Sequence, residues 1–450
     1  MNRIVRCSGR VLAGLPMLAV CLWGTAESES GLLQVLGRAH SRHALYAMTG
    51  HFDNPGPFGG FIAVTMAVAG AYLIRHRHAV RGPLQIVKTA AAAVAFAAGF
   101  LVLPASMSRG GWVALCVALA VAALRDRKIR GWIRTRRWFI PLATLLAAAL
   151  CVGAFALKPD SALGRLHIWR MECRALAAHP LGTGPGSVLG TYGRTQEAFF
   201  RTHLDRVSPT TVRVAGCPEY AFNEYLHVGI EYGVPGLLVF AGVLGLALWS
   251  LLARRSVLSY GLIAWMTFAL FSYPLSILRF DVLLAGFLVC AAVAAPVPAG
   301  WRLGGIVVAG ALSALVLIRG PQYPPFRRLF DVGYQQFQDG RYEEAITTLG
   351  DGAQISSDPM FHVIAGRCHE ALGEVDAAAE EYGTAHYMVP CRLYPLVRLM
   401  TLRLDAGDPV GAVEIGEQIV KMPVNERHTT MVRLRDEARS RLDSLKSVLP

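Results

Sequence analysis

The sequence has few charged residues, and this scarcity excludes an ordinary soluble protein. Of its 450 residues, 17% are charged and 54% are hydrophobic, whereas soluble domains carry about 25% charged residues. The charged residues gather in short runs, in the stretch 158–228 and after residue 320. Between them lie apolar runs near the length of about 20 residues that a helix needs to cross a bilayer. These features predict an integral membrane protein with a soluble tail.

Metal-ligand patterns and nucleotide-binding loops are also missing. The cysteines and histidines show no metal-ligand spacing, so we expect no metal. The glycines of HPLGTGPG (179–186) are not followed by the Lys-Ser/Thr pair of a nucleotide-binding loop, and proline would interrupt the row of amides that cradles phosphate. We interpret this segment as a rigid turn that ends an amphipathic helix lying on the outer leaflet.

Nine apolar segments are predicted to cross the membrane as helices. The first has a basic leader and ends in small residues, as a signal peptide does. We interpret it as an uncleaved span, because the charge pattern of the later loops requires one there. The nine segments cover residues 11–24, 58–74, 88–105, 110–124, 138–157, 234–253, 257–275, 282–300 and 303–318.

The distribution of arginine and lysine sets the predicted orientation, because cytoplasmic loops are enriched in these residues. With the N-terminus in the cytoplasm, the run RDRKIRGWIRTRR (125–137) lies inside. The short outer turns near 106–109 and 276–281 hold one arginine each. Topology therefore explains most of the net charge of +13, and we expect no nucleic-acid partner.

This orientation predicts two domains in a bacterial inner-membrane protein. Residues 1–318 form a transmembrane domain with a large periplasmic loop at 158–233, and residues 325–450 form a periplasmic domain. Four cysteines fall in the oxidising compartment and are open to disulfide pairing: Cys173 with Cys217, and Cys368 with Cys391.

The segment after residue 325 contains an internal repeat. Glycines recur at 340, 373 and 407, and the alanines Ala345, Ala378 and Ala412 keep the same step. A period of 33 to 34 residues, with small residues where paired helices touch, resembles the tetratricopeptide repeat. The third unit is weaker because Met400 stands where a small residue is expected. Two uses remain open for the repeats: a groove for a protein partner, or a helical cap on the membrane domain.

Two arginine-bearing segments lie on the predicted outer side. Arg109, in SRGGW (108–112), stands at the start of a helix, where its charge and the free backbone N–H groups both favour an anion. The alternative is an interface arginine that snorkels. The segment 164–188 carries Arg165, Arg170 and Arg174, of which the last two are four residues apart on one helical face.

A third polar cluster opens the span at 234–253. In CPEYAFNEYLHVGIEYGVPGLL (217–238), Asn223, His227 and Glu231 recur every four residues and form a polar stripe, with Glu224 beside it. Acids near the positive end of a helix are explained by the helix dipole alone. The alternative is that the stripe faces the arginines, so that acid and base groups flank an anionic substrate at the outer membrane surface.

Together these motifs resemble the O-antigen ligase and polymerase superfamily of bacterial polysaccharide assembly. Their order is Ser-Arg-Gly-x-Trp, Arg-x-x-x-x-Arg, His-Pro-Leu-Gly-x-Gly, and then Asn-Glu-Tyr-Leu followed by Glu-x-Gly-x-x-Gly-Leu. The segment GHFDNPGPFGGFIAV (50–64) is similar to the Asn-Pro-rich entry to a span in that family. The resemblance covers residues 50–300, and some members carry a C-terminal tetratricopeptide tail.

The resemblance implies an all-α polytopic glycosyltransferase with a large periplasmic loop over its active site. The donor would be a glycan on undecaprenyl diphosphate, and the acceptor the lipid A core, a growing polysaccharide or a protein, with no cofactor. By motif, Arg109, Arg165 and Arg170 would bind the diphosphate, with Arg279 in SILRFD as a further candidate. Guanidinium groups suit this role because they stay charged and bind two oxygens at once. We expect these arginines to gather at one place on the outer side.

The sequence departs from the family at the position of the expected base. Ligases have a histidine directly before the asparagine, and Phe222 stands there in this chain. Of Glu224, His227 and Glu231, we favour Glu224 as the group that accepts the proton of the acceptor hydroxyl, with Asn223 and His227 also in the catalytic set. Two alternatives remain open: an inactive form, and a non-catalytic scaffold that assembles envelope polysaccharide proteins through the repeats. A transporter is disfavoured, because charged residues are nearly absent from the span centres.

Overall fold

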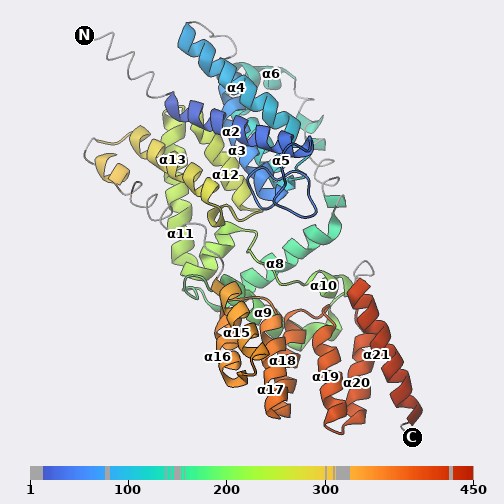
Figure 1. Cartoon of the computed structure of the whole chain (residues 1–450). Helices are drawn as coiled ribbons and strands as arrows, with labels where there is room; N and C mark the ends of the chain where they lie inside the picture. Colours follow the sequence, from blue (N-terminus) through green and yellow to red (C-terminus); the bar gives the residue numbers. More distant parts are fainter. Residues whose placement is uncertain are drawn as a thin grey trace. The chain divides into compact units, whose positions relative to one another are not determined.

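The computed structural model of the chain describes residues 14–76, 82–136, 138, 140–142, 144–145, 153, 155–156, 158–298, 300, 302–307, 310, 325–424 and 429–448. Every regular element among these residues is a helix, which confirms the predicted all-α class (Figure 1). The chain divides into two compact units. The first unit consists of Met1–Ala154, Phe222–Tyr225 and Leu238–Pro321, and the second of Phe155–Ala221, Leu226–Leu237 and Gln322–Pro450.

The first unit contains most of the predicted spans. Three helices, α3, α4 and α11, are long and apolar enough to cross a membrane, and α12 is a shorter apolar helix. These helices indicate a multi-pass membrane protein, whereas the number of nine spans stays a prediction, because 138–157 and 303–318 lie largely outside the described residues. The helices are α2 (Leu15–Val35), α3 (Pro55–His76), α4 (Pro83–Val102), α5 (Arg109–Arg125), α6 (Arg127–Thr135), α11 (Glu224–Ala253, whose residues 226–237 belong to the second unit), α12 (Leu258–Ala269), η2 (Pro274–Ser276) and α13 (Leu278–Ala294).

The helix that contains the first predicted span is longer than its apolar stretch. The prediction ended the span at residue 24, but α2 continues to Val35 and buries Glu27 and Ser28 in its second half. A carboxylate is tolerated there because Glu27 forms an ion pair with Arg279, at the start of α13. Residues 11–13 of the predicted span lie outside the described part of the chain.

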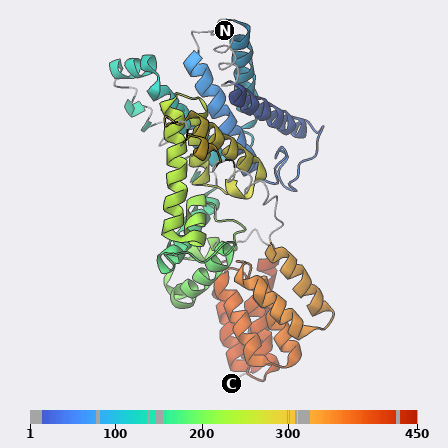
Figure 2. The same ribbon diagram turned by 90° about the vertical axis from the view of Figure 1, so that its left-hand side faces the viewer.

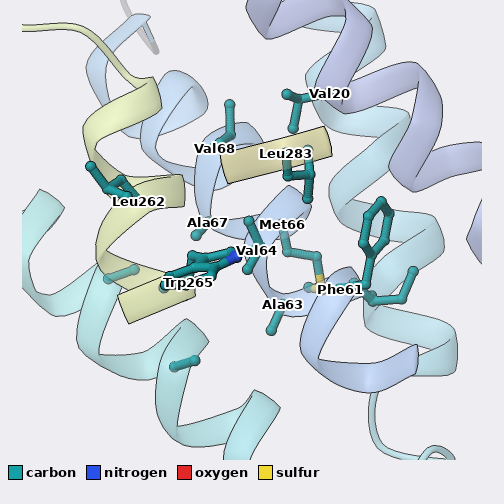
Figure 3. Close-up of a cluster of buried hydrophobic side chains, with 14 of the residues drawn as sticks. Val20, Phe61, Ala63, Val64, Met66, Ala67, Val68, Leu262, Trp265 and Leu283 are labelled. Atoms are coloured by element: carbon teal, nitrogen blue, oxygen red, sulfur yellow. The ribbon is translucent and has the colours of Figure 1, made fainter. Parts of the chain in front are cut away.

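Helix α3 forms the centre of the first unit. It is apolar all round and buried continuously from Pro57 to Tyr72, as expected for a helix surrounded by others. Figure 3 shows Phe61, Val64 and Met66 of α3 in one buried hydrophobic cluster with Trp265 of α12. Glycines let the helices approach closely: a Cβ on Gly111 of α5 would lie 2.7 Å from the carbonyl oxygen of Gly59. Small residues at such contacts are typical of helix packing in membranes.

The second unit joins the predicted outer loop to the C-terminal helices. The prediction grouped residues 158–233 with the transmembrane domain, whereas α9 of this loop packs against α18 and α16 of the C-terminal segment. The helices of the loop are α8 (Pro159–Ala178), α9 (Val188–His203), η1 (Leu204–Arg206) and α10 (Pro209–Val214). The C-terminal helices are α15 (Pro325–Gln338), α16 (Tyr342–Gln354), α17 (Met360–Leu372), α18 (Val375–Met388), α19 (Tyr394–Asp405), α20 (Pro409–Lys421) and α21 (Thr429–Val448).

The C-terminal helices form consecutive hairpins, drawn in orange and red in Figure 2. Gly340, Gly373 and Gly407 lie in the turns within the three hairpins, with φ of 78°, 78° and 76°. These left-handed turns explain the glycine step in the sequence, because other residues adopt such angles at a cost. The alanines at 345, 378 and 412 are fully buried. The hairpin repeat is therefore observed, and its assignment to the tetratricopeptide class stays a prediction.

Each hairpin contains a contact between a glycine on one helix and a large residue on the other. In the third hairpin the glycine and the large residue have exchanged helices. In the first hairpin, a Cβ on Gly333 would lie 2.8 Å from the side chain of Leu349. In the second hairpin, a Cβ on Gly366 would lie 2.7 Å from the ring of Tyr382. In the third, the large residue Met400 is on the first helix and the small one, Gly416, is on the second, with a Cβ-to-Cε distance of 3.3 Å. This exchange explains why Met400 departs from the sequence pattern.

Candidate functional site

The glycine-rich turn at 179–186 packs against a kink in α11. Pro235 has no N–H, so the carbonyl of Glu231 loses its helical donor, and Gly233 breaks the helix with φ 71° and ψ −174°. The turn supplies the missing bonds: Gly184 N donates to Glu231 O (3.0 Å) and Thr183 N to Ile230 O (2.8 Å). The two motifs, far apart in sequence, therefore form one backbone structure in the second unit.

Two glycines in this structure have no room for a side chain. A Cβ on Gly233 would lie 2.4 Å from the carbonyl carbon of Leu181, and a Cβ on Gly182 would lie 2.5 Å from Glu231 O. Both residues also have positive φ, a conformation that glycine adopts at no steric cost. Val234 N completes the contact by donating to Pro180 O (2.8 Å). The interpretation of HPLGTGPG as a rigid turn after a helix is thus confirmed, since α8 ends at Ala178; its place on a membrane leaflet stays a prediction.

Glu231 ties the turn to a histidine. Its Oε1 accepts a hydrogen bond from Gly186 N (2.7 Å) and lies 3.2 Å from Nε2 of His227, one turn earlier in α11. The side chain of Glu231 is 10% exposed and that of His227 is 28% exposed. The predicted stripe therefore contains a histidine oriented by a carboxylate, which is a common arrangement around a proton-accepting group.

Asn223 and Glu224 begin α11 in the first unit. Asn223 Oδ1 accepts from Tyr225 N (3.0 Å), as a helix cap does. Glu224 is 1% exposed, and its Oε1 accepts from Leu275 N (2.7 Å) in η2. Phe222, in the position of the family histidine, has a left-handed backbone with φ of 54°. The segment is thus held by a helix cap at Asn223 and by a hydrogen bond from the backbone of η2 to Glu224.

Arg109 begins α5 in the first unit and is half-buried. Ser108 caps the helix: its Oγ donates to Gly56 O (2.7 Å) and accepts from Gly111 N (3.4 Å). The Ser-Arg-Gly-Gly motif is therefore explained locally by a cap and by close contact with α3. Arg109 is therefore the first residue of a helix, a position where an anion is favoured.

Arg279 lies in a network that sequence reasoning did not find. Its Nε donates to Oε1 of Glu27 (2.9 Å), and its guanidinium stacks over Phe52 at 5.3 Å. The other oxygen of Glu27 lies 3.0 Å from Nδ1 of His51. Glu27 lies 252 residues before Arg279 in the sequence, so no local pattern marked it as a partner for this arginine.

Arg170 and Arg174 lie over one aromatic ring in the second unit. Their guanidinium carbons are 5.4 Å and 4.7 Å from the centre of Phe199. Both arginines are exposed, and within the described part of the chain neither forms an ion pair. By contrast, Arg213 nearby pairs with Asp160 at 2.9 Å. Like charges one helical turn apart repel each other modestly, and an anion bound between the two guanidinium groups would offset this repulsion.

The predicted site residues fall into two groups. Asn223 and Glu224 belong to the first unit with two of the arginines, and His227 to the second unit with the other two. The gathering of all four arginines at one place therefore stays a prediction. The arginines are Arg109 and Arg279 in the first unit, and Arg165 and Arg170 in the second.

The described cysteines are free thiols. Cys368 is fully buried in the core of the first hairpins. Cys217 accepts a hydrogen bond from Arg392 (3.0 Å), and Cys391 lies 3.5 Å from Ala215 O. Neither pairing left open by the sequence, Cys173 with Cys217 or Cys368 with Cys391, is formed. Among the described residues no group of histidine, cysteine and carboxylate side chains could hold a metal.

Comparison with protein families gives a match that covers the motifs described above. Residues 92–241 match the O-antigen ligase family. This match supports the O-antigen ligase superfamily, and it contains Arg109, Arg165, Arg170 and the residues of the α11 stripe but not Arg279. An O-antigen ligase domain in a multi-pass membrane protein indicates polysaccharide biosynthesis and a glycosyltransferase-like enzyme that acts on a lipid-linked glycan.

Comparison with curated protein sequences gives no match. Among solved structures, the type III secretion chaperone SycD of Yersinia enterocolitica, in complex with a peptide of the translocator YopD, is 19% identical over 28% of this chain and 96% of that one, with a TM-score of 0.25. A type III secretion complex from Aeromonas hydrophila is 18% identical over 30% of this chain and 88% of that one, with a TM-score of 0.26. Scores this low do not establish a shared fold.

Proposed function

We propose that the chain transfers a glycan from undecaprenyl diphosphate to an acceptor hydroxyl at the periplasmic face of the bacterial inner membrane. The match of residues 92–241 to the O-antigen ligase family carries this proposal. The acceptor is the lipid A core, a growing polysaccharide or a protein, and no cofactor takes part. The C-terminal hairpins, which we propose to be periplasmic tetratricopeptide repeats, belong to the same enzyme.

The arginines stabilise the leaving group in this reaction. The acceptor oxygen bonds to the anomeric carbon of the glycan, and the bond from that carbon to the diphosphate breaks, so negative charge develops on the diphosphate. Guanidinium groups in place before the reaction stabilise this charge. Three arginines are suited to this role by their position: Arg109 at the start of a helix, and the pair Arg170 and Arg174. Arg165 belongs to the same Arg-x-x-x-x-Arg motif as Arg170. Arg279 is the weakest candidate, because Glu27 already offsets its charge.

His227 is better placed than Glu224 to accept the proton of the acceptor hydroxyl. Glu224 is 1% exposed and accepts a backbone hydrogen bond, so it serves the fold at the start of α11. His227 is partly exposed, and Glu231 orients its ring and stabilises the charge that protonation would create. We propose that the imidazole takes the role that Phe222 cannot perform.

The test is a complementation experiment in a strain that lacks the gene. We expect Arg170→Ala and Arg109→Ala to abolish the surface glycan and to accumulate the lipid-linked glycan, while the protein still inserts in the membrane. Arg213→Ala is the matched control, because this exposed arginine pairs with Asp160 and lies outside the motifs. Wild-type surface glycan in both motif variants would overturn the proposal. His227→Gln and Glu224→Gln, assayed together, decide between the two bases.

A further inference from the structure

A buried glutamine joins four segments of the second unit. Gln196, in α9, is 1% exposed. Its Oε1 accepts from the hydroxyl of Tyr192 (2.5 Å) and lies 2.8 Å from Nε2 of His167 in α8. Its Nε2 donates to Gly216 O (3.1 Å) and to Met388 O (2.5 Å), at the end of α18. Both ends of the amide are therefore used.

The contacts fix the direction of the amide and show which ring nitrogen of the histidine donates to it. Two carbonyl oxygens accept from Nε2, so the oxygen of the amide must face Tyr192 and His167. His167 must then donate from Nε2 to this oxygen. Burial lowers the pKa of His167, and the nearby charge of Arg170 acts in the same direction. A glutamate at position 196 would keep the acceptor half of this arrangement and lose the donor half.

The contact between the loop and the C-terminal helices extends around Gln196. Ser357 Oγ donates to Pro218 O (2.7 Å), and Arg194 donates to Gln354 O (3.0 Å). Tyr387 of α18 packs against the apolar cluster formed by helices of the loop. The contact therefore has a packed centre and polar bonds around it, as a permanent interface does.

We propose that the C-terminal helices hold α8 in position, and that Gln196 is the positioning residue that connects them. His167 lies on α8 between Arg165 and Arg170, so a tie from Met388 through Gln196 to His167 fixes the helix that carries these arginines. The role in glycan transfer rests on the proposed function, whereas the mechanical connection does not. The sequence left two uses open for the repeats, a groove for a protein partner and a cap on the membrane domain. The use proposed here is a third one, in which the repeats support the loop at 158–233.

Hydrogen–deuterium exchange on the purified full-length protein tests the connection without an activity assay. The variant Gln196→Glu keeps the acceptor that faces His167 and removes both donors. We expect the amides of α8, at 159–178, to exchange at least about tenfold faster, because two buried hydrogen bonds are lost and each loss favours local opening. Gln338→Ala, an exposed position in α15, is the control and leaves α8 exchange unchanged.

A second variant guards against a local effect of the buried glutamate. Tyr387→Ala weakens the contact from the C-terminal side and alters no residue of the loop. Faster exchange in α8 in this variant supports the connection even if Gln196→Glu does not fold. Exchange that rises only at 214–221, with α8 as in the wild type in both variants, would show that Gln196 acts locally and would overturn the proposal.

The same variants separate this proposal from the proposed function. If the wild type transfers glycan, we expect Gln196→Glu to raise the KM for the lipid-linked donor more than it lowers kcat, because the arginines that bind the diphosphate lose their support. If the wild type transfers none, the proposed function fails and the exchange experiment still decides the positioning role. An unchanged KM together with faster α8 exchange would confine Gln196 to stability and overturn its role in catalysis.

Discussion

Two sites, one in each unit, provide for their polar groups in different ways. In the first unit, Arg279 is neutralised by the buried carboxylate of Glu27. In the second unit, the kink of α11 is satisfied backbone to backbone by the glycine-rich turn, and the exposed Arg170 and Arg174 rest on a phenyl ring. The difference follows from exposure to solvent. A charged group away from water needs an opposite charge beside it, whereas an exposed charged group needs none and stays available to bind a ligand.

The largest expected effect is in the backbone contact of the second unit. Gly233→Ala places a methyl group 2.4 Å from a backbone carbon at a positive φ. Neither the turn nor the kink can move without losing hydrogen bonds, so we expect a loss of about 3 kcal/mol or more of unfolding free energy. Chemical denaturation of the purified protein measures it. Gly242→Ala, in the same helix with open space around it, is the control, and equal stability of the two variants would contradict the account.

The next largest expected effect is a loss of unfolding free energy in the second unit at low pH. Burial lowers the pKa of His386, in α18, to about 4, against an ordinary value near 6.5. The unfolded chain therefore takes up a proton below pH 6.5 that the folded chain refuses until about pH 4. Stability is intact above pH 6.5 and falls by ~3 kcal/mol as the pH drops to about 4. Burial of His167 acts in the same direction.

Unfolding midpoints between pH 7.5 and pH 4.5 check this dependence. His386→Phe removes the titrating group and should flatten the curve, whereas His179→Phe, at an exposed position, should leave the slope as in the wild type. An equally steep curve for His386→Phe would assign the acid sensitivity to other groups.

A smaller loss of unfolding free energy is expected in the first unit when the ion pair between Glu27 and Arg279 is removed. Glu27→Gln leaves Arg279 one third exposed and without its carboxylate. Because water still reaches the guanidinium, we expect a loss of about 1–2 kcal/mol rather than the larger cost of a fully buried charge. The melting temperature of the detergent-solubilised protein measures it. Glu29→Gln, exposed on the same helix, serves as the control, and no difference between them would show that the pair adds nothing.

The smallest effect compares two hairpins within the second unit. Gly366→Ala forces a Cβ to 2.7 Å from the ring of Tyr382, whereas Gly416→Ala meets the flexible ends of Leu442 at 3.1 Å and Met400 at 3.3 Å. Alanine also favours a helix interior over glycine by about 1 kcal/mol. We therefore expect Gly416→Ala to be nearly neutral and Gly366→Ala to cost about 1–2 kcal/mol more, as measured by unfolding. Equal costs would show that the two hairpins do not differ in this contact.

The sequence predicted the features that depend on local pattern. Apolar runs located α3, α4 and α11, and the recurring glycines located the three hairpins, because a turn angle or a helix face is fixed by residues a few positions apart. Motif order also led to the O-antigen ligase resemblance, which residues 92–241 support. The spacing of Arg170 and Arg174 placed both on one helical face, as the structure has them.

Only the tertiary structure decided which distant segments meet. Nothing near Glu27 indicated Arg279, and nothing in HPLGTGPG indicated that its amides would donate to the carbonyls freed by the kink at Gly233 and Pro235. The same holds for Gln196, whose partners lie in three other segments of the chain. Such pairs form because buried polar groups have no water to bind and need a partner within the protein. Which group becomes that partner depends on how the helices pack, not on the residues next to it in the sequence.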